Sequence, residues 1–434
     1  MKESTLSPRY QIRRSVERLS YSPTLEINET IKALRDKGTQ VLHMGFGESP
    51  FPVHPKIQAA LAANADKNMY LPSAGIPALR QSAIDFFSTA FGFEGAGAEA
   101  VIGPGSKELI YDIQLALDGD LLLPVPSWVS YAPQASLIKD AVIKIPTNLA
   151  ENYHITARSL EEAILRAESK GLNPRKLLLN YPNNPTGLDI PSSQLEPIAR
   201  VCAEHQLIVI SDEIYGLVSF GGEHVSLAKF YPQGTIVTSG LSKHLSLGGY
   251  RLGVAVFPES LSEVHDAVVR IASETWSTVS APIQFAALEA FGDDPSIHEY
   301  IQTCTHIHSL ISGYVHGEIT SLGIPYPELQ GAFYLYPDFE PFRGLLKDRG
   351  VETSEDLTRV LIEEMQVATL PGTAFNDDPE NLRLRIACCD FDGENALAYY
   401  VEHPDCIRDE LIEATCPNIR LACEQLRAFF LVET

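Results

Sequence analysis

The chain has 434 residues, 45% of them apolar, which is enough apolar surface to build a large hydrophobic core and a smaller one. Lysine and arginine number 33 against 56 aspartate and glutamate, and this formal net charge of −23 disfavours nucleic acid or an anionic membrane as a partner. No apolar run approaches the roughly 20 residues that span a bilayer, and residues 1–20 lack a secretory signal pattern, so we expect a cytoplasmic protein.

The N-terminal segment, residues 1–58, contains one helical pattern at 26–38 followed by a proline-rich turn. We expect it to pack on the C-terminal part of the chain.

Residues 59–295 alternate short Val-, Ile- and Leu-rich runs with helix-length segments, which predicts an α/β domain. The seven predicted strands cover residues 99–103, 120–125, 141–146, 176–181, 207–212, 235–239 and 252–257. Because these runs are apolar without interruption, both faces of the sheet should be buried. The prediction is a large domain with a mostly parallel seven-stranded sheet covered by helices.

Residues 296–434 have a different texture, with long helical patterns at 299–320 and 354–366 and candidate strands at 331–337 and 382–389. They predict a smaller α+β domain, completed by the N-terminal segment. The stretch 389–420 within it suggests no function.

The seven cysteines form no CxxC pair and show no metal-ligand spacing. They are interpreted as reduced structural thiols, and no metal site is expected. Cys388 and Cys389 lie shortly after Arg385 in the sequence, and a buried packing role is favoured over a catalytic role for both thiols.

Polar motifs follow four of the predicted strands. They are PGSKE at 104–108, PNNPTG at 182–187, DEIYG at 212–216 and GLSK at 240–243. Each motif alone is explained by an ordinary turn or helix cap. The carboxyl ends of parallel strands meet at one sheet edge, where ligands of doubly wound folds bind, so the four together predict one site.

The order of these motifs resembles that of the class I and II aminotransferases, fold-type I enzymes that use pyridoxal 5'-phosphate. Asn184, Asp212, Lys243 and Arg251 follow one another at intervals of 28, 31 and 8 residues. The resemblance covers nearly the whole chain, through GFGESPF, NMYLPSAGIPALR, PSWVSY, GAFYLYP, LPGTAF and LRLRIA. Each motif is weak alone, and the ordered set is specific.

The resemblance implies catalytic roles at the cofactor ring. Lys243 would bond covalently to the cofactor aldehyde and move the substrate proton. Asp212 would face the pyridine nitrogen, and Tyr215 and Asn184 would hydrogen-bond the phenolic oxygen. Trp128 would stack on the ring.

The resemblance also implies a phosphate site. Its members would be the guanidinium of Arg251, the backbone of Gly105, Ser106 and Lys107 at a helix N-terminus, and the hydroxyl of Ser242. Many relatives carry a serine three residues before the lysine. This chain has Gly240 there, so one hydrogen bond of that phosphate site has no equivalent.

For the substrate, the resemblance assigns the α-carboxylate to Arg385, with Arg383 two positions earlier on the same strand face as the alternative. Asn184 would also contact the substrate, and Gly47 would let the backbone approach it. Lys107 resembles the lysine that one prokaryotic aspartate aminotransferase subgroup uses for the distal carboxylate.

These assignments imply transfer of an amino group between an amino acid and a 2-oxo acid, with aspartate and 2-oxoglutarate as the expected pair. Aromatic or other neutral amino acids remain an alternative, as does a lyase of the same fold type, such as a carbon–sulfur β-lyase or an aminocyclopropane carboxylate synthase. The resemblance also implies a homodimer with shared active sites, in which Tyr70 reaches the phosphate of the neighbouring subunit.

Overall fold

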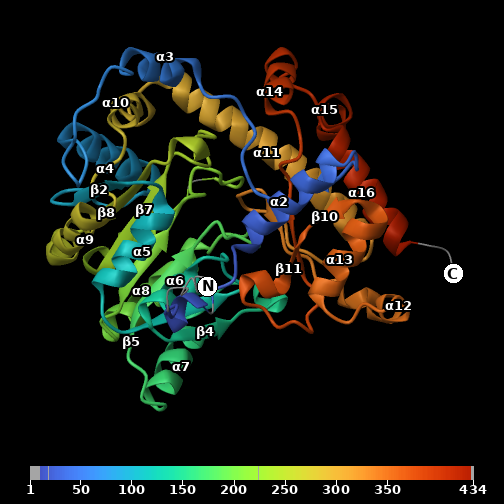
Figure 1. The fold of residues 1–434 in the computed structure, drawn as a ribbon, viewed down its shortest axis with the longest axis horizontal. Coiled ribbons are helices and arrows are strands. Elements are labelled where there is room, and N and C mark those ends of the chain that lie inside the picture. The colour runs from blue at the N-terminus through green and yellow to red at the C-terminus, as the bar shows by residue number, and fades with distance from the viewer. Residues whose placement is uncertain (1–9, 18, 223, 432–434) are drawn as a thin grey trace, which may run out of the picture.

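The computed structural model describes residues 10–17, 19–222 and 224–431, and its centre is a seven-stranded sheet in the order β2-β8-β7-β6-β5-β3-β4 (Figure 1). Its strands are β2 (Glu99–Gly103), β3 (Asp120–Val125), β4 (Val142–Pro146), β5 (Pro174–Asn180), β6 (Ile208–Asp212), β7 (Thr235–Gly240) and β8 (Gly253–Phe257). Neighbouring strands are parallel except that β8 runs antiparallel to β2 and β7. The predicted mostly parallel seven-stranded sheet is confirmed.

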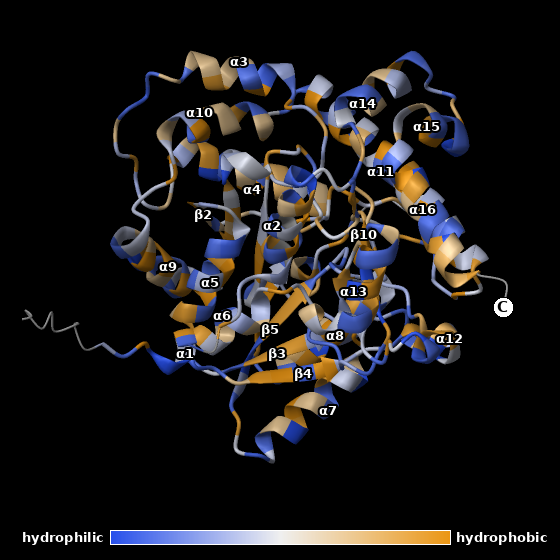
Figure 2. Cartoon of the chain, turned by 45° about the vertical axis from the view of Figure 1, so that its right-hand side comes forward, coloured by the Kyte–Doolittle hydropathy of each residue, from blue (hydrophilic) through white to orange (hydrophobic). Residues whose placement is uncertain are grey.

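Helices cover both faces of the sheet because successive residues of its central strands are apolar and point to opposite faces. Leu178 of β5 and Ile210 of β6 pack in the layer of α5 (Ser106–Ala116), α6 (Tyr131–Ile138) and α9 (Ser262–Thr275). Leu177 and Val209, one position earlier in the same strands, pack in the layer of α7 (Ala157–Glu168) and α8 (Ser192–Glu204). Figure 2 shows β3, β4 and β5 as apolar arrows between these layers.

On the second face, the β2 and β8 end of the sheet is covered by α4 (Pro77–Phe91) and α10 (Ala281–Ala290). Further out, α3 (Pro55–Ala63) packs against α10. The predicted boundary between residues 58 and 59 therefore falls inside a helix. A division that keeps helices whole would come before Pro55, and the division into two domains stays a prediction.

The C-terminal residues form a second, smaller sheet region. A three-stranded antiparallel sheet has the order β11 (Leu370–Pro371), β12 (Leu384–Ala387), β9 (Tyr334–Leu335). The N-terminal segment joins this region, because β1 (Leu42–His43) pairs in parallel with β10 (Val367–Ala368) and α2 (Pro23–Asp36) contacts β11 (Figure 1). The remaining helices of the segment and this region are α1 (Arg14–Glu17), α11 (Pro295–Ser321), α12 (Arg343–Asp348) and α13 (Ser354–Met365).

The stretch 389–420 contains α14 (Gly393–Glu402), α15 (Arg408–Thr415) and the start of α16 (Pro417–Phe430), all of which pack on α11. At its beginning, a Cβ added at Gly393 would lie 2.3 Å from the carbonyl oxygen of Pro50. The start of this stretch therefore packs against the backbone of the GFGESPF segment. Among the residues described, no helix combines the length and apolarity needed to cross a membrane.

Candidate active site

A cavity opens at the carboxyl ends of the parallel strands, where the sheet meets the C-terminal region. Eleven of the residues predicted from the sequence line it: Gly47, Ser106, Lys107, Trp128, Asn184, Asp212, Tyr215, Ser242, Lys243, Arg251 and Arg385. Gly105 lies directly behind Arg251, while Tyr70 lies outside the cavity with 92% of its surface exposed. The fold thus brings together predicted residues that are up to 338 positions apart in the sequence.

The cavity is rich in cations. Among the described residues, it contains Lys107, Lys243, Arg251 and Arg385 but only two carboxylates, Asp212 and Glu48. None of the four cations forms an ion pair within the described ranges. In a chain with a net charge of −23, such a group of unpaired cations indicates binding of anionic ligands.

Lys243 follows β7 and reaches the centre of the cavity. Its Nζ donates a hydrogen bond to the carbonyl oxygen of Gly47 at 3.0 Å and lies 5.5 Å from the ring centroid of Tyr215. Burial, with a smaller contribution from the charge of Arg385, lowers the pKa of Lys243 to about 8. A substantial fraction of the amine is therefore neutral near that pH, and the neutral amine is the form that attacks a carbonyl carbon.

Asp212 ends β6 and is 3% exposed. Its Oδ2 accepts a hydrogen bond from the hydroxyl of Tyr131 at 2.5 Å, and its Oδ1 accepts one from Thr238 at 3.4 Å. Burial raises the pKa of Asp212 to about 6. A buried carboxylate that forms no ion pair with any described residue is suited to a ligand that brings a positive charge.

Arg385, in β12, is 1% exposed and has no carboxylate partner among the described residues. Its Nη1 donates to Asn184 Oδ1 at 3.2 Å and its Nη2 to the carbonyl oxygen of Gly45 at 2.6 Å, while Nε has no hydrogen-bond partner there. The guanidinium lies 4.7 Å from the ring centroid of Tyr334. A buried guanidinium that lines a cavity and has no carboxylate partner among the described residues is suited to a carboxylate ligand.

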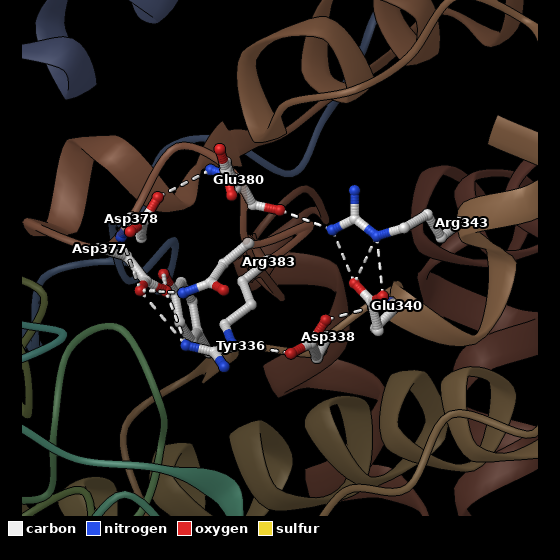
Figure 3. Close-up of polar contacts among 9 residues, drawn as sticks. Tyr336, Asp338, Glu340, Arg343, Asp377, Asp378, Glu380 and Arg383 are labelled. Atoms are coloured by element: carbon white, nitrogen blue, oxygen red, sulfur yellow. Dashed lines mark hydrogen bonds and ion pairs between the residues drawn. The ribbon is translucent and has the colours of Figure 1, made fainter. Parts of the chain in front are cut away.

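Arg383, the alternative to Arg385, lies outside the cavity in an ion-pair cluster of the C-terminal region (Figure 3). Its Nε donates to Asp338 at 2.8 Å and its Nη1 to Asp377 at 3.1 Å. Two carboxylates already neutralise this guanidinium. The geometry therefore favours Arg385 for the substrate carboxylate.

The start of α5 and Arg251 form one corner of the cavity. A Cβ at Gly105 would lie 2.2 Å from Arg251 Nη2, and a Cβ at Gly253 would lie 2.2 Å from the backbone nitrogen of Ser106, so both glycines permit this close approach. Gly105 is the N-cap and supplies no side-chain hydrogen bond, so the first N–H groups of α5 are open to a ligand. A helix N-terminus beside a guanidinium is suited to a phosphate.

Gly240 has a structural explanation in β7. A Cβ at this position would lie 2.7 Å from the backbone carbonyl oxygen of Leu252, the residue directly before β8, which pairs with β7. No serine side chain fits here without moving that backbone. The departure from the family pattern therefore follows from close strand packing.

The approach of the Gly47 backbone to the substrate stays a prediction, and the structure gives a further reason for glycine at this position. A Cβ at Gly47 would lie 1.9 Å from the hydroxyl oxygen of Tyr334. The same hydroxyl is 2.8 Å from that of Tyr215. Gly47 is therefore required by the Tyr334 hydroxyl, which holds Tyr215 in place.

Sequence reasoning missed seven cavity residues: Phe46, Glu48, Tyr131, Asn180, Ile214, Gly248 and Tyr334. Five of them lie within GFGESPF, PSWVSY, DEIYG or GAFYLYP, whereas Asn180 ends β5 and Gly248 lies between Lys243 and Arg251. Tyr131 comes three residues after Trp128, at the start of α6, and this spacing could have indicated its position near Asp212.

All seven cysteines are free thiols. Cys388 and Cys389 are buried, and burial raises the pKa of both thiols well above its usual range. Neither thiol is activated as a nucleophile, because the thiolate form is suppressed.

Comparisons with known proteins agree with this geometry. A family model described as aminotransferase class I and II matches residues 39–398. The aspartate aminotransferase of Geobacillus stearothermophilus is 30% identical, over 87% of this chain and 94% of its own length, and the asparagine–oxo-acid transaminase of Streptococcus mutans is 28% identical over 87% and 95%. Among solved structures, aspartate aminotransferase from Thermus thermophilus with maleate has a TM-score of 0.82 at 24% identity and covers 97% of this chain and 100% of its own.

Proposed function

The chain belongs to the class I and II aminotransferases, a family that uses pyridoxal 5'-phosphate, and on that premise we propose that it moves an amino group between an acidic amino acid, such as aspartate, and a 2-oxo acid, such as 2-oxoglutarate. The observation that carries the proposal is the set of four unpaired cations in the cavity. Lys243 and Arg251 are assigned to the cofactor. Arg385 and Lys107 then remain for the two carboxylates of an acidic substrate.

The residues present fit pyridoxal phosphate at both of its ends. The open N–H groups of α5 and the Arg251 guanidinium suit the phosphate dianion, as does the nearby hydroxyl of Ser242. At the other end, the buried carboxylate of Asp212 suits a protonated pyridine nitrogen. Tyr215 and Asn184 would bind the phenolic oxygen, and Trp128 would cover the ring.

When bound, the cofactor supplies an electron sink that stabilises negative charge at the substrate Cα. The chain's own groups would do the remaining work. Arg385 would hold the α-carboxylate. Lys243 would take the proton from Cα of the amino donor and, in the second half of the reaction, give a proton to Cα of the new amino acid. The amine of Lys243 can do both because burial brings its pKa to about 8, close to working pH.

Lys107 would determine the preference for acidic substrates. It lies at the exposed mouth of the cavity, with Nζ 5.4 Å from the ring centroid of Trp128. Burial, and next the charge of Arg251, lower the pKa of Lys107. A lysine in the first turn also opposes the helix dipole, so its position is unfavourable unless an anion binds beside it.

A Lys107→Met variant should therefore lose activity on acidic substrates only. We expect kcat/KM for aspartate to fall roughly 5- to 150-fold, which corresponds to a loss of about 1–3 kcal/mol of transition-state stabilisation. The kcat/KM for alanine or phenylalanine should change little. Steady-state kinetics on a panel of amino donors measures both. Lys170→Met, which removes an exposed lysine far from the cavity, controls for the change in net charge.

Equal losses across the panel would mean that Lys107 supports the cofactor instead. A wild-type preference for asparagine, aromatic or small neutral donors would overturn the acidic assignment. Release of pyruvate and ammonia without an acceptor would indicate the lyase alternative.

We also propose a homodimer with shared sites, on the basis of Tyr70. Its side chain is 92% exposed in the single chain, next to Met69, which is 51% exposed, and two such neighbouring apolar side chains suit a protein interface. Tyr70 would contact the phosphate in the site of the other subunit.

Mixing inactive Lys243→Ala and Tyr70→Ala proteins under subunit exchange tests this. Each heterodimer would hold one intact and one doubly altered site, so statistical exchange should restore about a quarter of wild-type activity. Full activity of Tyr70→Ala alone, or no recovery in verified heterodimers, would contradict a shared site.

A further inference from the structure

The DEIYG segment turns its side chains alternately to the two faces of the sheet. Asp212 lies on the face of Ile210, toward α6, and lines the cavity with Tyr215. Glu213 lies on the other face and is fully buried. The segment that carries two proposed cofactor residues is thus anchored from behind by Glu213.

Both carboxylate oxygens of Glu213 are occupied. Oε1 accepts hydrogen bonds from the hydroxyls of Ser211 at 2.7 Å, Ser226 at 2.6 Å and Tyr181 at 3.2 Å. Oε2 lies 2.9 Å from Nε2 of His224. Three hydroxyl donors and a ring nitrogen around one buried carboxylate are suited to its ionised form.

His224 faces a second carboxylate with its other nitrogen. Its Nδ1 lies 3.7 Å from Asp189 Oδ2, and its ring is buried between those of Phe91 and Tyr181, at centroid distances of 4.9 and 5.1 Å. Asp189 lies two residues after the PNNPTG loop, which carries Asn184. One imidazole therefore connects the two segments that supply Asn184, Asp212 and Tyr215.

His224 also contacts the DEIYG segment directly. A Cβ added at Gly216 would lie 2.9 Å from His224 Cδ2, so only glycine lets the ring pack this close. The ring thus fixes the segment by packing as well as by charge.

We propose that His224, as an imidazolium between Glu213 and Asp189, is a positioning residue that holds the two cofactor-binding segments in register across the sheet edge. It touches neither cofactor nor substrate. The inference rests on the proposed roles of Asn184, Asp212 and Tyr215, and it adds a residue outside the cavity on which those roles depend.

The surroundings of His224 determine its charge. Burial alone lowers the pKa of a histidine, but hydrogen bonding and the charges of Asp189 and Glu213 raise that of His224 to about 9. A neutral ring would leave the fully buried carboxylate of Glu213 and the partly exposed one of Asp189 without a cation between them, which is unfavourable above all for Glu213. The positive charge also offsets Glu213, whose carboxylate neighbours Asp212 in the chain.

A His224→Gln variant tests the inference, because glutamine can still donate a hydrogen bond toward Glu213 but carries no charge. Titration of the apoprotein with pyridoxal phosphate should show an affinity roughly 10- to 100-fold weaker than wild type, by analogy with the range for residues that orient metal ligands. The absorption maximum of the bound cofactor should also shift. The control is His265→Gln, another buried histidine beside carboxylates, on α9, which should leave both readouts unchanged.

Adding Glu213→Gln to His224→Gln should recover much of the lost affinity, because the neutral pair leaves no unpaired charge at that contact. Unchanged affinity in His224→Gln would overturn the inference. So would an equal loss in the double variant, because His224 would then act by its shape alone.

If His224→Gln does not fold, nitrogen-15 NMR of the histidine-labelled wild-type apoprotein decides. At about pH 8, the imidazole that contacts the rings of Phe91 and Tyr181 should carry protons on both nitrogens, and a neutral ring would contradict the inference. This result needs no cofactor. Failure of the wild type to bind pyridoxal phosphate would instead contradict the proposed function.

Discussion

Replacing Lys243 with alanine should abolish transamination while the protein stays folded. The amine of Lys243 is proposed both to bond to the cofactor and to move the Cα proton, and loss of a general acid–base group alone costs up to about 10⁴-fold in rate. That factor corresponds to about 5 kcal/mol of transition-state stabilisation. Turnover should be measured with saturating cofactor, so that weaker cofactor binding does not account for the loss.

Folding of the Lys243→Ala protein is expected because the change removes a cation from a cavity already crowded with cations. Far-ultraviolet circular dichroism and thermal unfolding check this. Lys107→Ala, at the mouth of the same cavity, is the matched control and should keep its activity on neutral donors. Turnover of Lys243→Ala within about tenfold of wild type would show that another group does the chemistry.

The second large effect is expected for Asp212→Asn, which keeps the shape of the side chain but cannot carry its charge. The variant should bind pyridoxal phosphate yet turn over roughly 10²- to 10³-fold more slowly, the usual cost of removing one preorganised electrostatic contact. The reason is that a neutral amide cannot stabilise a protonated pyridine nitrogen. Equilibrium dialysis of the cofactor and steady-state kinetics separate binding from turnover.

Asp212→Asn should not destabilise the apoprotein above pH 6. Burial raises the pKa of Asp212 from 3.8 to about 6, so between these values the folded chain binds more protons than the unfolded chain. Stability therefore falls as the pH rises through this window, by up to about 3 kcal/mol for a shift of this size. Asparagine removes the cost of the buried charge.

At pH values above 6, the apo Asp212→Asn protein should thus unfold at a temperature no lower than wild type. Loss of activity together with a large loss of apoprotein stability would mean that Asp212 acts mainly as a structural residue. Wild-type turnover in Asp212→Asn would contradict its proposed place at the pyridine nitrogen.

The strands and most cavity residues could be predicted because their signals are local. Each strand of the large sheet is a short apolar run whose two faces are both buried, and DEIYG and GLSK directly follow two of these runs. The edge of a parallel sheet then brings such motifs together. On this basis Asn184, Asp212 and Lys243 could be expected at one site, and the family resemblance supplied the roles proposed for them.

The choice between Arg383 and Arg385 and the reason for Gly47 could not be predicted, because both depend on contacts between distant parts of the chain. Arg383 and Arg385 are equivalent by spacing, and only the positions of Asp338 and Asp377 distinguish them. Glycine is required at position 47 because Tyr334, 287 residues later in the chain, occupies the space of a side chain there. Neither composition nor periodicity carries this information.

The proposed role of Lys243 is tested most directly by locating the covalent bond between the protein and the cofactor. Protein reconstituted with pyridoxal phosphate is reduced with borohydride, digested and analysed by peptide mass mapping. We expect a pyridoxyl group on Lys243 and on no other lysine. A pyridoxyl group on Lys107 or another lysine, or none after reconstitution, would contradict it.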